Sequence, residues 1–269
     1  SFKKFNIKKL LNTNFKKKLK LITIPTTAGS GAEATPGAVI YSNKIKYSVE
    51  HHLIKPDKFF LIPQLVLSGS KKIKASSGFD AFAQCIESVF SKKANTKSIN
   101  FAIKGLKLLD KNFLNFYKNS NLKNAKNTLL GSNFSGKAIA ISKTTAPHAL
   151  SYPFSTHYNI SHGYAVSLTL AEIIKFNYEN MNLSKNTPKI QKKFDQIFKI
   201  TKSRDIKAFI TYVKNLKKKI NFKNKLSELG INLSIAYPRI IKGINPNRLK
   251  NNPVDINLLQ IKKILEEIR

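Results

Sequence analysis

Residues 148–163 have the sequence HALSYPFSTHYNISHG, which contains three of the chain's five histidines. Pro153 interrupts the segment, and the His-Gly pair at 162–163 comes directly before an apolar helical run. A helix, a tight loop and a second helix can bring His148 and His162 to one point. Because imidazole nitrogens bind iron, zinc and similar ions well, the segment predicts a metal site between two helices.

A carboxylate usually completes such a site, and the candidate is Asp80 in SGFDAFAQCIES (77–88). Asp80 lies in the first turn of a predicted helix, with Gln84 four residues later on the same face. A single Asp near a helix start is more often a cap or a partner of the helix dipole. A single His is more often structural. Spacing alone therefore leaves the metal site and a structural role both open.

The apolar pattern divides the chain into two parts. Residues 19–26, 38–41 and 59–65 predict short strands, the first of them buried, while helical periodicity dominates from Lys71 onward. We expect an α/β fragment of a domain over 1–70 and an all-helical domain over 71–269. The predicted helices span 78–90, 96–117, 122–142, 164–177, 189–200, 205–216 and 258–268.

The chain is strongly basic, with 48 Lys+Arg against 14 Asp+Glu and a net charge of +34. Such a charge attracts nucleic acid and anionic surfaces without specificity. The lysines are spread along the whole chain, however, and no nucleic-acid-binding motif accompanies them. We therefore expect no specific nucleic-acid partner, although a cationic surface can steer small anionic substrates.

The sequence also limits where the protein works. The single cysteine, Cys85, excludes a disulfide scaffold and fits a reducing compartment. No run reaches the roughly 18–20 apolar residues of a membrane span, and residues 1–20 lack the apolar block of a signal peptide. We expect a cytoplasmic protein without a membrane partner. Because residue 1 is Ser and the one Met is Met181, we expect the sequence to begin inside a longer protein.

Three segments follow one another in the order PTTAGSGAEAT (25–35), SGFDAFAQCIES (77–88) and HALSYPFSTHYNISHG (148–163). Together they resemble the signature blocks of the iron-containing (group III) alcohol dehydrogenase family. Asn-Asn-Pro at 251–253 is similar to a turn that the family often places before its last helix. The resemblance, over about residues 20–269, implies the fold shared with dehydroquinate synthase. That fold is a nucleotide-binding α/β domain followed by a helical metal-binding domain. We also expect the full-length protein to be a homodimer.

The resemblance implies a metal held by Asp80, His148 and His162, with Fe²⁺ expected and Zn²⁺ as the alternative. Gln84 stands where the family usually has a further His ligand, and Tyr152 stands where many members have a His near the reacting carbon. Both residues resemble the pattern of the phosphonoacetaldehyde reductase-like branch. We therefore favour that branch over decay of the site, and we keep Gln84 as a candidate ligand.

The loop at 25–35 resembles the family segment that lies along the nicotinamide and its ribose. This implies that Thr26, Thr27 and Thr35 contact NADH or NADPH, with an ordinary polar turn as the alternative. Lys46 and Leu65 match looser cofactor contacts. Phosphate binding needs backbone amides at a helix start behind a Gly-rich loop, and residues 1–20 contain none. The chain as given is therefore expected to bind NAD(P)H poorly.

The implied activity is metal-dependent reduction of a small aldehyde by NAD(P)H, with phosphonoacetaldehyde and its product 2-hydroxyethylphosphonate as the first candidates. The metal would supply Lewis-acid chemistry at the aldehyde oxygen. His157 and Tyr152 are candidates for proton delivery, with water or the cofactor ribose as rivals. Lys143, Thr144 and Thr145 are candidates for binding the phosphonate, although a solvated lysine is as good an interpretation.

Three alternatives stay open. The first is a general alcohol or aldehyde dehydrogenase of the same family that acts on an uncharged substrate. The second is a non-catalytic fragment that keeps the fold and lacks the activity. The third is a zinc-dependent relative similar to dehydroquinate synthase or glycerol dehydrogenase, against which the segment at 148–163 argues.

Overall fold

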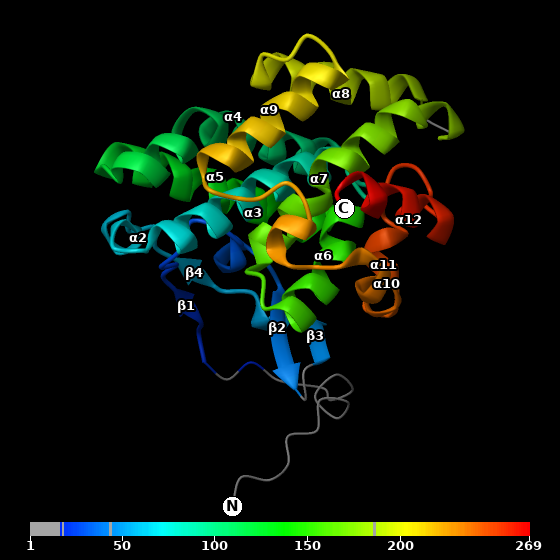
Figure 1. Cartoon of the computed structure of the whole chain (residues 1–269). Helices are drawn as coiled ribbons and strands as arrows, with labels where there is room; N and C mark the ends of the chain where they lie inside the picture. Colours follow the sequence, from blue (N-terminus) through cyan, green and yellow to red (C-terminus); the bar gives the residue numbers. More distant parts are fainter. Residues whose placement is uncertain (1–16, 18, 43–44, 185–186) are drawn as a thin grey trace, which may run out of the picture.

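The computed structural model describes residues 17, 19–42, 45–184 and 187–269, in which a small strand-containing part precedes a helical domain (Figure 1). In the first part β1 pairs in parallel with β4. β2 and β3 form an antiparallel hairpin in which Gly37 lies opposite Glu50. The elements of this part are β1 (Ile22–Thr23), η1 (Ala32–Ala34), β2 (Gly37–Ser42), β3 (Ile45–Glu50), η2 (His52–Ile54), β4 (Lys58–Phe59) and α2 (Gln64–Leu67).

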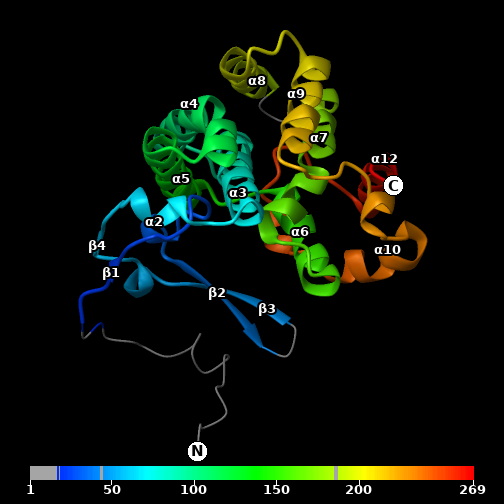
Figure 2. The ribbon, with the colours of Figure 1, turned by 60° about the vertical axis from the view of Figure 1, so that its left-hand side comes forward.

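The central helix of the helical domain is α3, which packs against α4, α5 and α7 (Figure 2). Among the described residues no helix is both long and apolar enough to cross a membrane. The helices of this domain are α3 (Lys71–Phe90), α4 (Thr96–Asn119), α5 (Leu122–Ser142), α6 (Ala146–Tyr158), α7 (His162–Glu179), η3 (Met181–Leu183), α8 (Thr187–Thr201), α9 (Ile206–Lys219), η4 (Ser227–Leu229), α10 (Leu233–Lys242), α11 (Pro246–Leu249) and α12 (Leu258–Glu267).

Helix α3 begins at Lys71, earlier than the apolar pattern predicts. Ser70 caps it by accepting a hydrogen bond from the backbone N–H of Ile73. The early turns are held by Lys74, whose buried ammonium donates to the carbonyl of Leu67 at 2.6 Å and to the hydroxyl of Ser120 at 2.7 Å. The lysine therefore donates hydrogen bonds to oxygen atoms near the ends of two other helices. The apolar periodicity of the sequence does not predict this role.

Helix α6 runs through Pro153, which the sequence suggested would break a helix. Proline lacks the N–H that would bond to the carbonyl four residues earlier, here that of Ala149. The backbone N–H of Asn245, from the segment before α11, donates to that carbonyl at 3.4 Å. A contact distant in sequence thus replaces the missing helical bond, and α6 continues to Tyr158.

The strands at 19–26 and 59–65 are shorter than predicted, whereas β2 extends slightly beyond the expected 38–41 and its partner β3 was not predicted. β1 covers only Ile22–Thr23 of the expected segment 19–26, and Leu21, Ile22 and Ile24 are 40%, 54% and 46% exposed. The prediction of a buried strand there is therefore wrong. Only Phe59 of the segment 59–65 belongs to β4, and α2 begins after Pro63. The fold class itself, strands first and an all-helical domain after them, is confirmed.

Candidate metal centre

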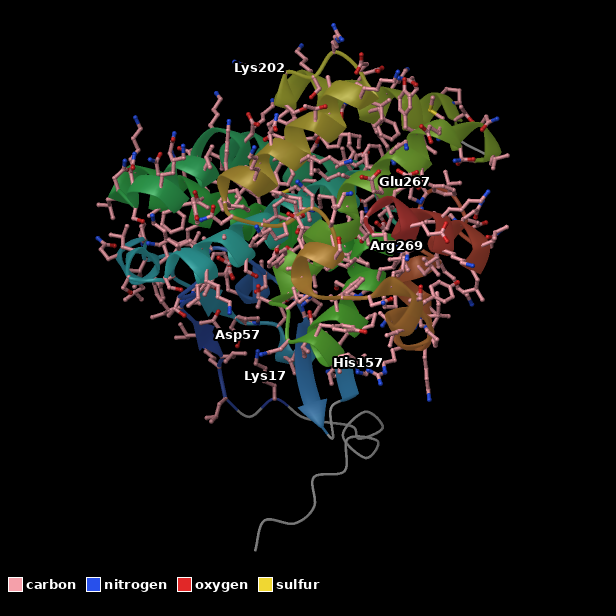
Figure 3. All side chains as sticks on the ribbon, in the orientation of Figure 1. Lys17, Asp57, His157, Lys202, Glu267 and Arg269 are labelled. Carbon is pink, nitrogen blue, oxygen red and sulfur yellow. The ribbon has the colours of Figure 1, made fainter. Side chains whose placement is uncertain are left out.

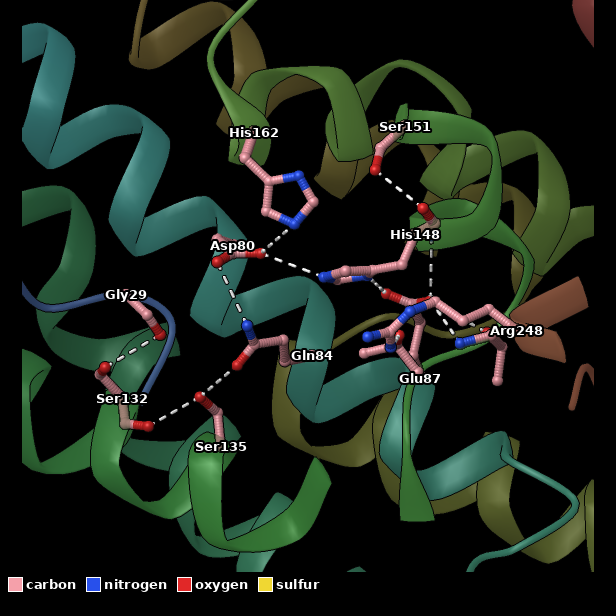
Figure 4. A network of polar contacts seen from close by, with 12 residues as sticks. Gly29, Asp80, Gln84, Glu87, Ser132, Ser135, His148, Ser151, His162 and Arg248 are labelled. Carbon is pink, nitrogen blue, oxygen red and sulfur yellow. Dashed lines mark hydrogen bonds and ion pairs between the residues drawn. The ribbon is translucent and has the colours of Figure 1, made fainter. Parts of the chain in front are cut away.

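Asp80, His148 and His162 meet at the junction of α3, α6 and α7 (Figure 4). One ligand atom of each lies within 4.8 Å of the others. The distance from His148 Nε2 to Asp80 Oδ1 is 3.1 Å, and that from His162 Nε2 to the same oxygen is 3.9 Å. The predicted carboxylate and both predicted histidines are therefore together in space.

Local backbone features bring the two histidines to α3. Asn159 ends α6 in the left-handed conformation, with φ 51° and ψ 31°, so the chain reverses before α7. Gly163, next to His162, lies so close to α3 that an added Cβ would be 1.9 Å from the carbonyl oxygen of Ser76. Only glycine allows this approach, and His162 reaches Asp80 because of it.

A second carboxylate, Glu87, orients His148 from behind. Its fully buried Oε1 accepts hydrogen bonds from the backbone N–H of Thr145 at 2.9 Å, the hydroxyl of Thr145 at 3.1 Å and the N–H of His148 at 3.3 Å. Its Oε2 pairs with Nδ1 of His148. This pairing keeps the proton on Nδ1 and directs Nε2 toward Asp80, which is how proteins commonly orient a metal-binding imidazole.

Burial and the surrounding charges shift the pKa of His148 in opposite directions. Burial lowers the pKa of His148, but the negative charges and hydrogen bonds of Glu87 and Asp80 outweigh burial and raise the pKa above its ordinary value. Asp80 and Glu87 therefore favour positive charge at the position of the His148 ring.

The donor set fits a divalent transition metal. Two imidazole nitrogens and one carboxylate oxygen form the ligand set of many iron sites, and similar three-residue sets hold catalytic zinc. Three protein ligands leave coordination positions for water or a substrate.

Gln84 lies beside the cluster with its amide nitrogen toward the carboxylate. Nε2 donates to Oδ2 of Asp80 at 3.2 Å, and Oε1 accepts from the hydroxyl of Ser135 at 2.9 Å. In this arrangement Gln84 orients Asp80, and the amide oxygen that would bind a metal is bonded to Ser135. A ligand role for Gln84 stays a prediction.

A cavity of about 540 Å³ opens onto the cluster. Asp80, Gln84, His148 and His162 all line it. The rest of its wall comes from the loop at 25–35 with β2, from the ends of β3 and α5, from α6 and from α11. The wall residues outside the cluster that bear on the chemistry are Thr35, Glu50, Lys143, Thr144, Tyr152 and Arg248.

The loop that contains the predicted cofactor contacts is fixed to α5. The hydroxyl of Ser132 donates to the carbonyl of Gly29 at 2.9 Å, and Asn133 donates to Glu33 at 2.9 Å. Gly31, at φ +61°, lies so close to Gly136 that a Cβ on either residue would collide with the other's backbone. Two facing glycines therefore let the loop rest directly on the helix.

The structure places the predicted cofactor residues in different surroundings. Thr35 lines the cavity, whereas Thr26 and Thr27 are exposed in the same loop and do not line it. Leu65 lies on α2 and is 43% exposed. Lys46 pairs with Tyr41 in the hairpin, and its side chain is outside the described part. Their cofactor roles stay predictions.

Some of the predicted catalytic and substrate-binding residues line the cavity, and others do not. Tyr152, Lys143 and Thr144 line the cavity. His157 is exposed near the end of α6 and does not line it (Figure 3). Thr145 is buried with its hydroxyl on Glu87.

Two residues of the site, Glu87 and Arg248, were missed by sequence reasoning. Glu87 lies seven residues after Asp80, two helical turns along the same face, and this spacing was a usable signal. Arg248 is one of only four arginines in a chain that otherwise uses lysine. Arg248 Nε donates to the hydroxyl of Tyr152 at 2.9 Å, and Nη1 donates to that of Thr144.

Comparison with known proteins gives a consistent result. Residues 74–269 match the model of the Fe-containing alcohol dehydrogenase family, C-terminal, and residues 2–63 match that of iron-containing alcohol dehydrogenase. A phosphonoacetaldehyde reductase from Streptomyces viridochromogenes is 28% identical over 163 residues, which cover 60% of this chain and 41% of that protein. An aldehyde-alcohol dehydrogenase from Clostridium acetobutylicum is 28% identical over 232 residues, 80% of this chain and 27% of that protein.

Among solved structures, sulfoacetaldehyde reductase from Bifidobacterium kashiwanohense in complex with NAD⁺ is 25% identical, with a TM-score of 0.85. That match covers 99% of this chain and 70% of the other. The expected fold is thereby confirmed, and the chain spans less than half the length of the two curated relatives.

Proposed function

The chain belongs to the iron-containing alcohol dehydrogenase family, and from this premise we propose that it is the metal-binding part of an NAD(P)H-dependent reductase of a small aldehyde. The main support is the convergence of Asp80, His148 and His162 on one wall of a cavity of about 540 Å³. A cavity of this size is sufficient for a small substrate. We further propose a cytoplasmic location, which the single buried cysteine favours.

Asp80, His148 and His162 would hold the metal. When bound, Fe²⁺ or Zn²⁺ supplies Lewis-acid polarisation of the aldehyde oxygen. Glu87 keeps the His148 ring in the orientation that points Nε2 into the cavity. Gln84 restrains the other oxygen of the Asp80 carboxylate. These contacts preorganise the site, so little reorganisation is needed when charge develops on the substrate oxygen.

Reduction of the aldehyde adds a hydride from the nicotinamide to the carbonyl carbon and a proton to the oxygen. Tyr152 is the better placed of the two predicted proton donors, because it lines the cavity and His157 does not. The Tyr152 hydroxyl accepts a hydrogen bond from Arg248 Nε at 2.9 Å, and a phenolic hydroxyl can act both as a donor and as an acceptor. Thr35, on the same cavity, is the best-placed predicted contact for the cofactor.

We propose phosphonoacetaldehyde as the substrate and 2-hydroxyethylphosphonate as the product. Two relatives support this choice by their names, phosphonoacetaldehyde reductase and sulfoacetaldehyde reductase. Both names specify a two-carbon aldehyde with an anionic group on the far carbon. The cavity wall of this chain contains two cationic side chains, Lys143 and Arg248, and Arg248 donates to the hydroxyl of Thr144.

The test uses the full-length protein that contains this chain. Metal content is measured by elemental analysis, and rates are measured with NADH and NADPH on phosphonoacetaldehyde and on propanal. We expect stoichiometric iron or zinc, and we expect Asp80→Asn to lose both metal and activity. Asp195→Asn, an exposed change on α8, is the matched control. A protein that reduces phosphonoacetaldehyde equally well without metal would disprove the proposal.

A second candidate is a general alcohol or aldehyde dehydrogenase for uncharged substrates. The aldehyde-alcohol dehydrogenase relative favours it, because its name specifies no charged group. A higher kcat/KM for propanal than for phosphonoacetaldehyde would select this candidate. A metal-free protein that reduces neither aldehyde would instead support a non-catalytic role.

A further inference from the structure

Arg248 reaches the cavity from a segment distant in sequence from the metal ligands. Asn245 caps α11 by accepting the N–H of Arg248 at 3.1 Å, which fixes the backbone of the arginine. Its guanidinium carbon lies 6.0 Å from the centre of the Tyr152 ring. The centre of that ring is in turn 6.5 Å from the centre of the His162 ring. The Tyr152 ring is therefore a near neighbour of both Arg248 and a predicted metal ligand.

Among the residues that the structure describes, no carboxylate forms an ion pair with Arg248. None of the ion pairs in the described part of the chain involves it, and its two side-chain partners, Tyr152 and Thr144, are neutral hydroxyls. A guanidinium has five N–H donors, so most of its donor capacity remains for a ligand.

Lys143, the lysine predicted to bind the substrate, is in a different situation. Its ammonium pairs with the carboxylate of Glu50 and donates to the carbonyl of Ala140 at 3.1 Å. The Lys143–Glu50 pair is neutral as a unit. Arg248 is therefore the cation of this cavity wall that an anionic ligand can pair with directly.

The same buried groups position Arg248 and the metal ligands. Asn251 donates to the carbonyls of Ser142 and Thr144, both at 2.9 Å, and so fixes the turn that presents the Thr144 hydroxyl to Arg248. The next residue in that turn is bonded to Glu87, which also orients His148. These buried hydrogen bonds therefore fix the distance between the guanidinium and the metal cluster. A site that binds both ends of one short molecule requires such a fixed distance.

We propose that Arg248, assisted by the hydroxyl of Thr144, binds a tetrahedral oxyanion, a phosphonate or sulfonate, at the far end of a short aldehyde. The planar fork of a guanidinium matches such a group because it can donate two parallel hydrogen bonds. The inference rests on the proposed reductase function and assigns the charge selectivity of that site to Arg248 instead of Lys143.

The binding test uses this chain, with ethylphosphonate and ethanesulfonate as probes in isothermal titration. Hydrogen bonds to a charged group are worth about 1.5–3 kcal/mol, so we expect Arg248→Met to weaken ethylphosphonate binding about 10- to 100-fold. Arg239→Met removes the same charge from an exposed position on α10, away from the cavity, and should change the affinity less than twofold. Tyr152→Phe, which removes one support of the guanidinium, should give a smaller loss. It supplies the second variant if Arg248→Met does not fold.

Three results would overturn the inference: no binding of either probe by the wild-type chain, equal binding by Arg248→Met, or a loss that follows Lys143→Met and spares Arg248→Met. Binding of either probe that depends on Arg248 supports it, and the tighter probe identifies the phosphonate or the sulfonate.

Rates on propanal and phosphonoacetaldehyde by the full-length protein separate this inference from the proposed function. Reduction of propanal without Arg248-dependent anion binding would retain the reductase and reject the anion site. Arg248-dependent binding without reduction of either aldehyde would retain the anion site and reject the reductase.

Discussion

Replacing Gly163 by alanine tests whether the close contact between α7 and α3 positions the metal ligands. The added Cβ would lie 1.9 Å from the carbonyl oxygen of Ser76 and 3.0 Å from Cβ of Asp80. Because these neighbours are a helix backbone and the first side-chain carbon of a ligand, they cannot turn aside as a flexible side chain can. The start of α7 has to move away from α3, and His162 has to move with it.

The size of this movement follows from contact distances. A carbon and a carbonyl oxygen in contact lie roughly 3.3 Å apart or more, so the start of α7 must withdraw by about 1.4 Å from its position near Ser76. Metal–ligand distances vary by only about 0.2 Å. We therefore expect Gly163→Ala to weaken metal binding by about 10- to 100-fold, as loss of a supporting contact does. The overpacking should cost about 1–3 kcal/mol of stability.

The assay is titration of the chain with Co²⁺, followed by visible absorption, with Zn²⁺ competition for affinity and urea unfolding for stability. Gly69→Ala is the control, because an added Cβ there meets its nearest atom at an ordinary 3.5 Å. Wild-type Co²⁺ affinity in Gly163→Ala, together with a stability loss below about 0.5 kcal/mol, would show that His162 does not depend on this contact.

Other residues yield three further predictions. Glu87→Gln should lower Zn²⁺ affinity about 10- to 100-fold in a chelator competition, because the neutral amide orients the His148 ring less firmly. Lys143 has φ 58° and ψ 176°, a backbone region that favours glycine, so Lys143→Gly should be about 1 kcal/mol more stable in urea than Lys143→Ala. Burial lowers the pKa of Lys217 to about 8, against 10.5 when unfolded. The unfolded chain therefore holds more protons between these values, and this lysine should add about 3 kcal/mol of stability as pH rises through that window. Lys217→Met should lack that rise.

Each of these three predictions has an outcome that contradicts it. Unchanged Zn²⁺ affinity in Glu87→Gln, with unfolding like that of wild type, would mean that the buried carboxylate only supports the fold. Equal stability of the glycine and alanine variants at position 143 would remove the argument from backbone strain. For Lys217 the quantity compared is the difference between wild type and Lys217→Met, since the many exposed lysines titrate in both. A constant difference between pH 8 and 10.5 would refute the lowered pKa.

The grouping of Asp80, His148 and His162 was expected because two short segments resemble a known family, whereas spacing alone left a structural role open. Asp80, His148 and His162 come from two such segments, and the structure brings them together. The helix at 122–142 was also predictable, since Asn121, a favourable cap residue, comes directly before it and accepts the N–H of Asn124.

Other features depend on contacts that no local pattern contains. Pro153 remains inside α6 because a backbone N–H from Asn245 replaces the missing bond. Lys74 is buried because carbonyl and hydroxyl oxygens from other segments surround its ammonium. Arg248 could not be assigned to the cavity before the fold placed α11 beside α6. Tertiary partners far along the chain determine all three.

The fixed contact between the loop at 25–35 and α5 limits how this protein can move. Gly31 and Gly136 touch backbone to backbone, and hydrogen bonds to Gly29 and Glu33 hold the loop on either side. Residues 29–33 of the loop are therefore held on α5, which packs against α3, the helix that contains Asp80. If the strands and the helices swing against each other during turnover, the hinge must lie outside residues 29–33. The loop would then move together with the metal ligands. The distance between the loop and these ligands would stay the same when the cavity opens.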